Sequence, residues 1–111
     1  MLQKMFVRAF AQASATAAAE LAERLRQHLA AAAAQVQVRS TQPYWKIEGY
    51  QEICLDVQFF ENGTRGFAAI IDRLGTGWMQ QRPGEAIWNA GGSATFAEPA
   101  VRWAQAELQE L

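Results

Sequence analysis

The sequence predicts an α+β fold, in which a mainly antiparallel sheet packs against one long N-terminal helix and one short helix. Two patterns carry this prediction. From Ala9 to Ala34, 13 of 26 residues are alanine, the strongest helix former. From Glu52 to Phe59, polar and apolar residues alternate, which indicates a half-buried strand. A length of 111 residues corresponds to one domain, so we expect residues 1–111 to form a single α+β domain.

The N-terminal part predicts a strand followed by the long helix. Met5 to Phe10 is short, apolar and partly β-branched or aromatic, as strands are. Ser14 or Thr16 is a candidate N-cap. One apolar stripe recurs at helical spacing, and its members are Ala18, Leu21, Leu25, Leu29 and Ala32. His28 lies beside this stripe and is expected to be an ordinary helix-flank residue.

The central part predicts strands. Val36 and Val38 alternate with polar residues, and Ser40 to Pro43 is expected to end that strand. Trp45 to Glu48 could form a separate short strand before a bulge at Gly49. Along the next strand, one face takes Ile53, Leu55, Val57 and Phe59, and the other takes Glu52, Cys54, Asp56 and Gln58. One side of the sheet is therefore expected to be polar and relatively acidic.

The remaining chain predicts a short helix, a hairpin and an ambiguous tail. Asn62-Gly63 indicates a turn, and helical spacing follows at Phe67, Ile70, Ile71 and Leu74, although a strand over Phe67 to Ile71 is the alternative. Pro83-Gly84 is expected to close a hairpin between Trp78–Arg82 and Glu85–Ala90. Local propensity favours a helix for Glu98 to Leu111, and a final strand through Val101 and Trp103 is the alternative.

Charge and composition restrict the function. The net charge is −1, which argues against a nucleic-acid binder that depends on a general positive field. Residues 1–40 hold five basic and two acidic side chains, whereas residues 41–111 hold five basic and nine acidic ones. An acidic face in the second part would attract a basic protein and speed the encounter. No stretch approaches the roughly 20 apolar residues of a membrane span, so we expect no membrane partner.

Few residues are available for catalysis. One His and one Cys exclude a multi-ligand His/Cys metal site and a disulfide within one chain. Glu48 and Glu52 would lie about 13 Å apart on a strand, too far for a glycosidase pair. Cys54 lies between two apolar residues and is expected to be an inert thiol, as suits a reducing cytosol. We therefore expect no enzyme activity, no cofactor and no bound metal.

Aromatic and acidic residues cluster where a protein partner could bind. Tryptophan and tyrosine bury much area with little loss of conformational entropy, which makes them frequent interface anchors. The predicted partner-binding residues are the anchors Tyr44, Trp45 and Tyr50 and the electrostatic contacts Glu48, Glu52, Asp56 and Glu61.

The segment Trp45-Lys-Ile-Glu-Gly-Tyr50, followed by Glu52, resembles small bacterial immunity proteins of polymorphic toxin and contact-dependent growth inhibition systems. The resemblance extends over residues 44–108 and includes Gly77-Trp78, Glu85–Asn89, Phe96, Pro99 and Val101–Ala104. It implies an α+β protein that binds and neutralises a cognate toxin, in many cases a nuclease, in the cytoplasm of the producing cell. It also implies a strand in the C-terminal tail.

Three other functions remain open on the sequence. The chain could be a small-molecule-binding domain with an apolar pocket between helix and sheet. It could instead be a structural subunit of a bacterial assembly. An enzyme that uses Cys54 or His28 is the third alternative. The sequence leaves the oligomeric state and the identity of the toxin undetermined.

Overall fold

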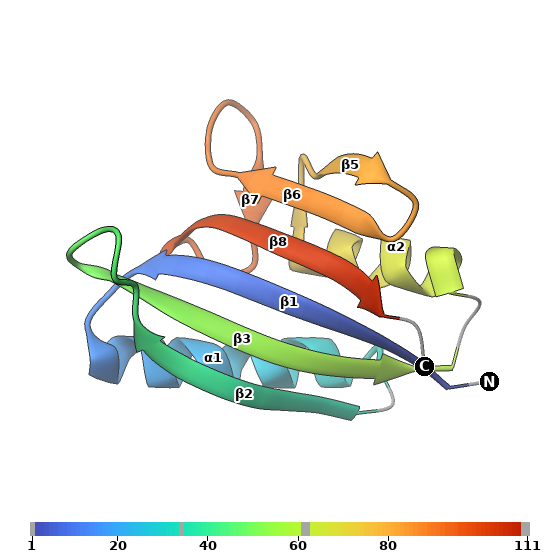
Figure 1. The fold of residues 1–111 in the computed structure, drawn as a ribbon, viewed down its shortest axis with the longest axis horizontal. Helices are drawn as coiled ribbons and strands as arrows, with labels where there is room; N and C mark the ends of the chain where they lie inside the picture. Colours follow the sequence, from blue (N-terminus) through green and yellow to red (C-terminus); the bar gives the residue numbers. More distant parts are fainter. Residues whose placement is uncertain (1, 34, 61–62, 110–111) are drawn as a thin grey trace.

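The computed structural model describes residues 2–33, 35–60 and 63–109. Its elements are β1 (Gln3–Gln12), α1 (Ala15–Ala30), β2 (Gln35–Pro43), β3 (Tyr50–Phe59), α2 (Gly63–Leu74), β4 (Gly75–Thr76), β5 (Met79–Arg82), β6 (Glu85–Asn89), β7 (Thr95–Phe96) and β8 (Val101–Gln109). Six strands form one antiparallel sheet in the order β2–β3–β1–β8–β6–β5, and β4 pairs separately with β7 (Figure 1). The predicted α+β class with a mainly antiparallel sheet is confirmed.

The four strands β2–β3–β1–β8 form a recognisable unit. In chain order they alternate with the helices as β1–α1–β2–β3–α2–β8, which is the split βαβ, or ferredoxin-like, arrangement. The hairpin of β5 and β6 adds two strands beyond β8. Both helices lie behind the sheet in the view of Figure 1, so no helix of the described residues covers the opposite side of the sheet.

The core lies between the sheet and the helices. Helix α1 buries Ala18, Leu21, Ala22, Leu25 and Leu29, and α2 buries Gly66, Phe67, Ile70, Ile71 and Leu74. The predicted cap is confirmed at Ser14, whose Oγ accepts a hydrogen bond from the Ala17 N–H at 3.2 Å. The predicted helix over Phe67 to Leu74 is also confirmed, whereas Asn62 of the predicted turn lies outside the described residues.

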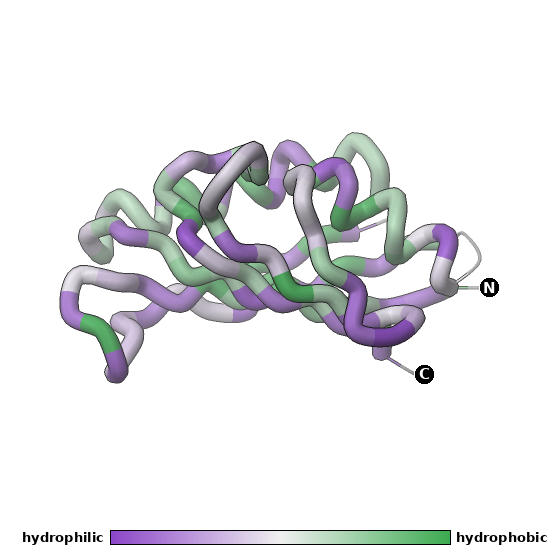
Figure 2. The backbone as a smooth tube through the Cα atoms, turned by 90° about the horizontal axis from the view of Figure 1, so that it is seen from above, coloured by the Kyte–Doolittle hydropathy of each residue, from purple (hydrophilic) through white to green (hydrophobic). Residues whose placement is uncertain are grey.

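Strand alternation sets the inward face of the sheet. Residues of β3 turned toward the helices are Ile53, Leu55, Val57 and Phe59, as predicted, and all four are buried. Their neighbours on β1 in the antiparallel register are Ala9, Val7, Met5 and Gln3. Figure 2 shows this alternation as short hydrophilic and hydrophobic segments that follow one another along the strands. The outward residues of the same strands therefore define a second, polar face.

Two predictions about the central strands are wrong. Strand β2 does not end at Ser40, because it continues to Pro43 after a register shift between Val38 and Ser40. β2 is an edge strand, so the missing N–H of Pro43 costs no pairing inside the sheet. The segment from Trp45 to Glu48 is a turn in the β2–β3 loop, not a separate strand.

The predicted C-terminal helix is also wrong, and the alternative strand is confirmed. β8 pairs with β1 on one side and with β6 on the other, so its backbone groups are used in two ladders. The predicted hairpin around Pro83-Gly84 is confirmed by the pairing of β5 with β6. Neither helix is long and apolar enough to cross a membrane within the residues that the structure describes.

Candidate functional site

The side of the sheet that carries no helix is the candidate site, and we call it the open face. The antiparallel registers arrange its outward residues in rows that cross the strands, with three central rows followed by a polar row of Gln35, Gln58, Lys4 and Gln109. The first row contains Gln42, Glu52, Phe10, Trp103 and Asn89; the second contains Ser40, Cys54, Arg8, Gln105, Ile87 and Met79; the third contains Gln37, Asp56, Phe6, Glu107 and Glu85. Aromatic, charged and amide side chains therefore share one continuous surface.

Four aromatic rings gather at one end of the open face and form what we call the aromatic cluster: Phe10, Tyr44, Tyr50 and Trp103. Phe10 stacks on Trp103 with ring centroids 4.7 Å apart and meets Tyr44 edge-on at 4.8 Å. Trp103 also contacts Tyr44 at 5.8 Å and Tyr50 at 5.3 Å. Such offset and edge-to-face pairs contribute about 0.5–1.5 kcal/mol each beyond their area burial. The cluster thus fixes both ends of the β2–β3 loop.

The β2–β3 loop presents apolar side chains to solvent. Trp45 is 83% exposed and Ile47 is 41% exposed. Backbone hydrogen bonds close the loop, because the Tyr44 N–H donates to the Tyr50 carbonyl at 2.9 Å and the Tyr50 N–H donates to the Ile47 carbonyl at 3.3 Å. Gly49 has a φ of 84°, which favours glycine at the last position before β3. The loop is therefore a closed turn, which fixes the backbone position from which the exposed tryptophan projects.

A charged network lies next to the aromatic cluster. The Arg8 Nε donates to Glu52 Oε2 at 3.0 Å, and the Gln42 side-chain amide donates to Glu52 Oε1 at 2.8 Å. Burial opposes ionisation of Glu52, but the hydrogen bonds from Arg8 and Gln42 outweigh it and lower the pKa of the carboxyl. The hydrogen bond to Glu52 raises the pKa of Arg8 in turn. Glu52 is consequently a buried, ionised partner of Arg8.

Folding pairs many of the acids with basic residues from the first part of the chain. Asp56 accepts hydrogen bonds from Arg39 at 2.9 and 2.6 Å, and Glu98 forms an ion pair with Arg24 at 2.7 Å. Together with the pair between Arg8 and Glu52, these contacts join residues 1–40 to residues 41–111. The charge asymmetry along the sequence is thus partly cancelled in space. Glu52 and Asp56 already have partners inside the protein.

The nucleophile and base considered from the sequence lie on opposite sides of the sheet. Cys54 belongs to the open face and is buried, and burial raises the pKa of its thiol. His28 lies on α1, and its Nε2 lies 2.7 Å from the carbonyl oxygen of Arg73 on α2. These two residues are therefore not brought together. Within residues 2–33, 35–60 and 63–109, no group of three His, Cys, Asp or Glu side chains is placed to hold a metal ion.

The predicted site residues that the structure describes separate into three groups. Tyr44 and Tyr50 lie in the aromatic cluster, with Trp45 at its outer edge, where its ring centroid is 6.5 Å from that of Tyr44. Glu48 is exposed in the β2–β3 loop and forms no ion pair with any described residue. Glu52 and Asp56 are engaged internally, as described above. Glu61 lies outside the described residues.

Two members of the cluster, Phe10 and Trp103, were not among the predicted site residues. The sequence carries the signal for Phe10, because it occupies the polar-side position of a predicted strand that also includes Phe6 and Arg8. Trp103 could not be predicted in this way, because the helical propensity of the residues around it favoured a helix over a strand. It joins the site only because β8 lies beside β1 in the sheet.

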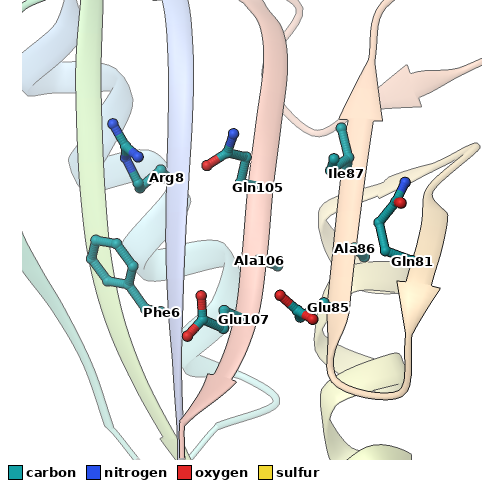
Figure 3. Close-up of a pocket in the computed structure, with 9 residues that line it drawn as sticks. All are labelled: Phe6, Arg8, Gln81, Glu85, Ala86, Ile87, Gln105, Ala106 and Glu107. Carbon is teal, nitrogen blue, oxygen red and sulfur yellow. The ribbon is translucent and has the colours of Figure 1, made fainter.

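A hollow of about 320 Å³ occupies the other part of the open face, over β1, β8, β6 and β5 (Figure 3). It is lined by Phe6, Arg8, Gln81, Glu85, Ala86, Ile87, Gln105, Ala106 and Glu107. A second hollow of about 350 Å³ lies beside the loop that joins β6 to β7, and Trp88 and Phe96 are among its lining residues. Both hollows are lined by strand and loop residues and not by α1 or α2, unlike the pocket between helix and sheet that a small-molecule-binding domain was expected to have.

Comparisons of this chain with protein-family models, with curated proteins and with solved structures each find no match. Its geometry is that of a split βαβ sheet, extended beyond β8 by the β5–β6 hairpin that precedes β8 in the chain, with one open face that is aromatic and polar.

Proposed function

We propose that the chain is a protein-interaction domain that binds its partner with the β2–β3 loop and the adjoining open face. The observation that carries this proposal is Trp45, a large apolar side chain that is 83% exposed at the end of a closed loop. Exposed tryptophans in a fixed position are frequent anchors of protein interfaces. Ile47 in the same loop adds further apolar area for a partner to cover.

The anchor is organised before binding. The rings of Tyr44 and Tyr50 hold the two ends of the loop against Trp103, and the loop closes with its own backbone hydrogen bonds. An ordered loop loses little conformational entropy when it binds, so more of the contact energy appears as affinity. The Lys46 ammonium lies 5.1 Å from the centroid of the Trp45 ring, within cation–π distance.

We propose that the partner is a cognate toxin and that binding occludes its active surface in the cytoplasm of the producing cell. The resemblance of Trp45–Tyr50 and Glu52 to immunity proteins supports this choice of partner. It also favours a nuclease, whose substrate-binding surface is basic. Charge steering in this proposal depends on Glu48, since Glu52 and Asp56 already pair with Arg8 and Arg39. No step of the proposed function is catalytic, and no cofactor takes part.

The proposal is tested with the polypeptide encoded by the neighbouring open reading frame. We expect that polypeptide to arrest growth when expressed alone, and co-expression of the wild-type chain to restore growth. Co-expression of Trp45→Ala should restore growth poorly at equal protein level, whereas Ser93→Ala, in an exposed loop before β7, should protect as well as wild type. A neighbouring polypeptide that neither arrests growth nor binds the chain contradicts the toxin-neutralising role.

A further inference from the structure

The hollow on the open face has an amphipathic lining. Phe6 and Ile87 provide apolar walls on two sides, and both are partly exposed. In Figure 3 the carboxylates of Glu107 and Glu85 face each other from β8 and β6, Ile87 lies one row further along β6 beside Gln105, and Gln81 completes the rim. An apolar wall with an acidic centre fits a ligand that has an apolar stem and a cationic head.

The two carboxylates are directly opposed. In the register of β6 and β8, Glu85 lies beside Glu107, and Phe6 follows on β1 in the same row. Like charges directly opposite each other destabilise a sheet, so the fold itself gains nothing from this pair. Glu85 has a partner in Arg82, the largely exposed last residue of β5, and Glu107 forms no ion pair with any described residue. Negative charge is therefore left available in the hollow.

The remaining basic side chain of the hollow does not compensate this charge. The Arg8 guanidinium hydrogen-bonds to Glu52 on β3, on the side away from β8 and β6. In Figure 3 its side chain points away from Glu107 and Glu85. Arg39, which lies over the Phe6 ring at 4.6 Å, is likewise held by Asp56. Lys4 lies in the next row of the open face, beside Gln109, and forms no ion pair with Glu107 among the described contacts, so the Glu107 carboxylate is free to meet an external cation.

We propose that the hollow receives an arginine side chain of the partner protein, as a second contact beside the Trp45 anchor. This inference rests on the proposed function, in which the open face covers a basic protein surface. Arginine fits better than lysine for two reasons. Its planar guanidinium has five donors and can bridge two carboxylates, whereas the lysine ammonium is a compact, strongly hydrated charge. Its apolar stem can also pack along Phe6 and Ile87.

The binding of a single arginine derivative tests the inference without the toxin. N-acetyl-arginine-amide is titrated into the ¹⁵N-labelled full chain, and amide chemical shifts are followed. We expect saturable shifts at residues 85–87 and 105–107. N-acetyl-citrulline-amide, which has nearly the same shape but no charge, should cause no such shifts, and N-acetyl-lysine-amide should bind more weakly. Absence of arginine-dependent shifts in these residues, or equal binding of citrulline, overturns the inference.

Variants locate the contact. Glu107→Gln keeps the shape of the side chain and should weaken arginine binding about tenfold, the loss expected for one charge-assisted hydrogen bond. Glu20→Gln, on the exposed side of α1, removes the same charge elsewhere and should leave the affinity unchanged. Equal effects of the two substitutions contradict a local contact. Because Glu107→Gln also relieves repulsion from Glu85, it should not reduce the stability of the fold.

Capture of the neighbouring toxin, measured separately, distinguishes the two proposals. Toxin binding that persists in Glu107→Gln, together with no arginine-dependent shifts, removes the hollow from the interface but leaves the proposed function standing. Arginine-dependent shifts without any toxin binding refute the toxin as partner. In that case the hollow remains an arginine site and another protein must supply the side chain.

Discussion

The rings of Phe10 and Trp103 stack across the two neighbouring strands β1 and β8, with centroids 4.7 Å apart and planes inclined by 16°. This contact joins the first strand of the chain to the last one. It also forms the surface against which Tyr44 packs at the base of the β2–β3 loop. The position of the proposed anchor therefore depends on an interaction between the two ends of the sequence.

Trp103→Ala should destabilise the fold, because it removes the ring that contacts Phe10, Tyr44 and Tyr50. We expect a loss of about 2 kcal/mol in the free energy of unfolding, less than for a fully buried tryptophan. Trp45→Ala should change it by less than about 0.5 kcal/mol, since that side chain is mostly exposed. Urea unfolding followed by far-UV circular dichroism measures both. Equal destabilisation by the two substitutions would contradict the assigned roles.

Glu52→Gln should reduce stability at neutral pH by about 1–3 kcal/mol, since it weakens the hydrogen bonds between a buried carboxylate and Arg8. The pKa of Glu52 is lowered in the folded state, so its stabilisation is complete above the unfolded-state pKa of about 4.3. It is lost as the pH falls through the folded-state pKa. The difference between wild type and Glu52→Gln should therefore shrink in acid.

Urea midpoints measured from pH 7 down to pH 3 test this dependence. Glu23→Gln is the control, because Glu23 also pairs with an arginine, Arg26, but on the exposed surface of α1. Exposed pairs contribute little, so this variant should follow the wild-type curve. A difference between wild type and Glu52→Gln that stays constant over the whole range would show that the loss is steric and not ionic.

Glu48→Lys should slow association with the toxin by about threefold and reduce the dependence of the rate on salt. Glu48 is exposed beside Trp45 and has no ion-pair partner among the described residues, so its reversal leaves the folded state intact. Glu20→Lys on α1 makes the same change in net charge outside the proposed interface. Stopped-flow association rates of Glu48→Lys and Glu20→Lys are compared at several salt concentrations. Identical rates for the two variants would exclude local steering by Glu48.

Gly75→Ala should destabilise the pairing of β4 with β7. A Cβ atom at residue 75 would overlap the carbonyl oxygen of Thr95 and lie 3.0 Å from Cδ1 of Phe96. The backbone can move away from the added Cβ atom only by distorting the strand pairing, so we expect the free energy of unfolding to fall by about 2 kcal/mol. Ser93→Ala in the exposed loop before β7 is the control and should have almost no effect. Thermal unfolding monitored by tryptophan fluorescence measures the change, and an unchanged midpoint for Gly75→Ala would refute the close approach.

Sequence patterns predicted α1, α2 and β3 well, because their apolar residues repeat with the period of each element. The tail was mispredicted for a physical reason. Val101 and Ala104 both face the core, three residues apart, because the register of β8 shifts next to Trp103. The shift gives the buried residues the i, i+3 spacing of a helix, in a segment whose alanine and glutamate residues also favour a helix. Pairing with β1 and β6 overrides that local propensity.

The site was predicted in part. Tyr44 and Tyr50 flank the alternating strand and could be found from it, as could exposed Trp45. The partners of Glu52 and Asp56 could not, because Arg8 and Arg39 lie on other strands and the pairing depends on the strand order. Counts of charge along the chain therefore overstate the acidity of the open face.

The measurement that tests the central claim most directly compares the toxin affinities of Trp45→Ala and Phe60→Ala. Phe60 is 69% exposed and follows the far end of β3, so it is an aromatic of similar exposure outside the proposed interface. Isothermal titration calorimetry with the neighbouring toxin should show affinity reduced about thirtyfold or more for Trp45→Ala and less than about threefold for Phe60→Ala. Equal affinities for the two variants, or a larger loss for Phe60→Ala, would contradict binding through the β2–β3 loop and the open face.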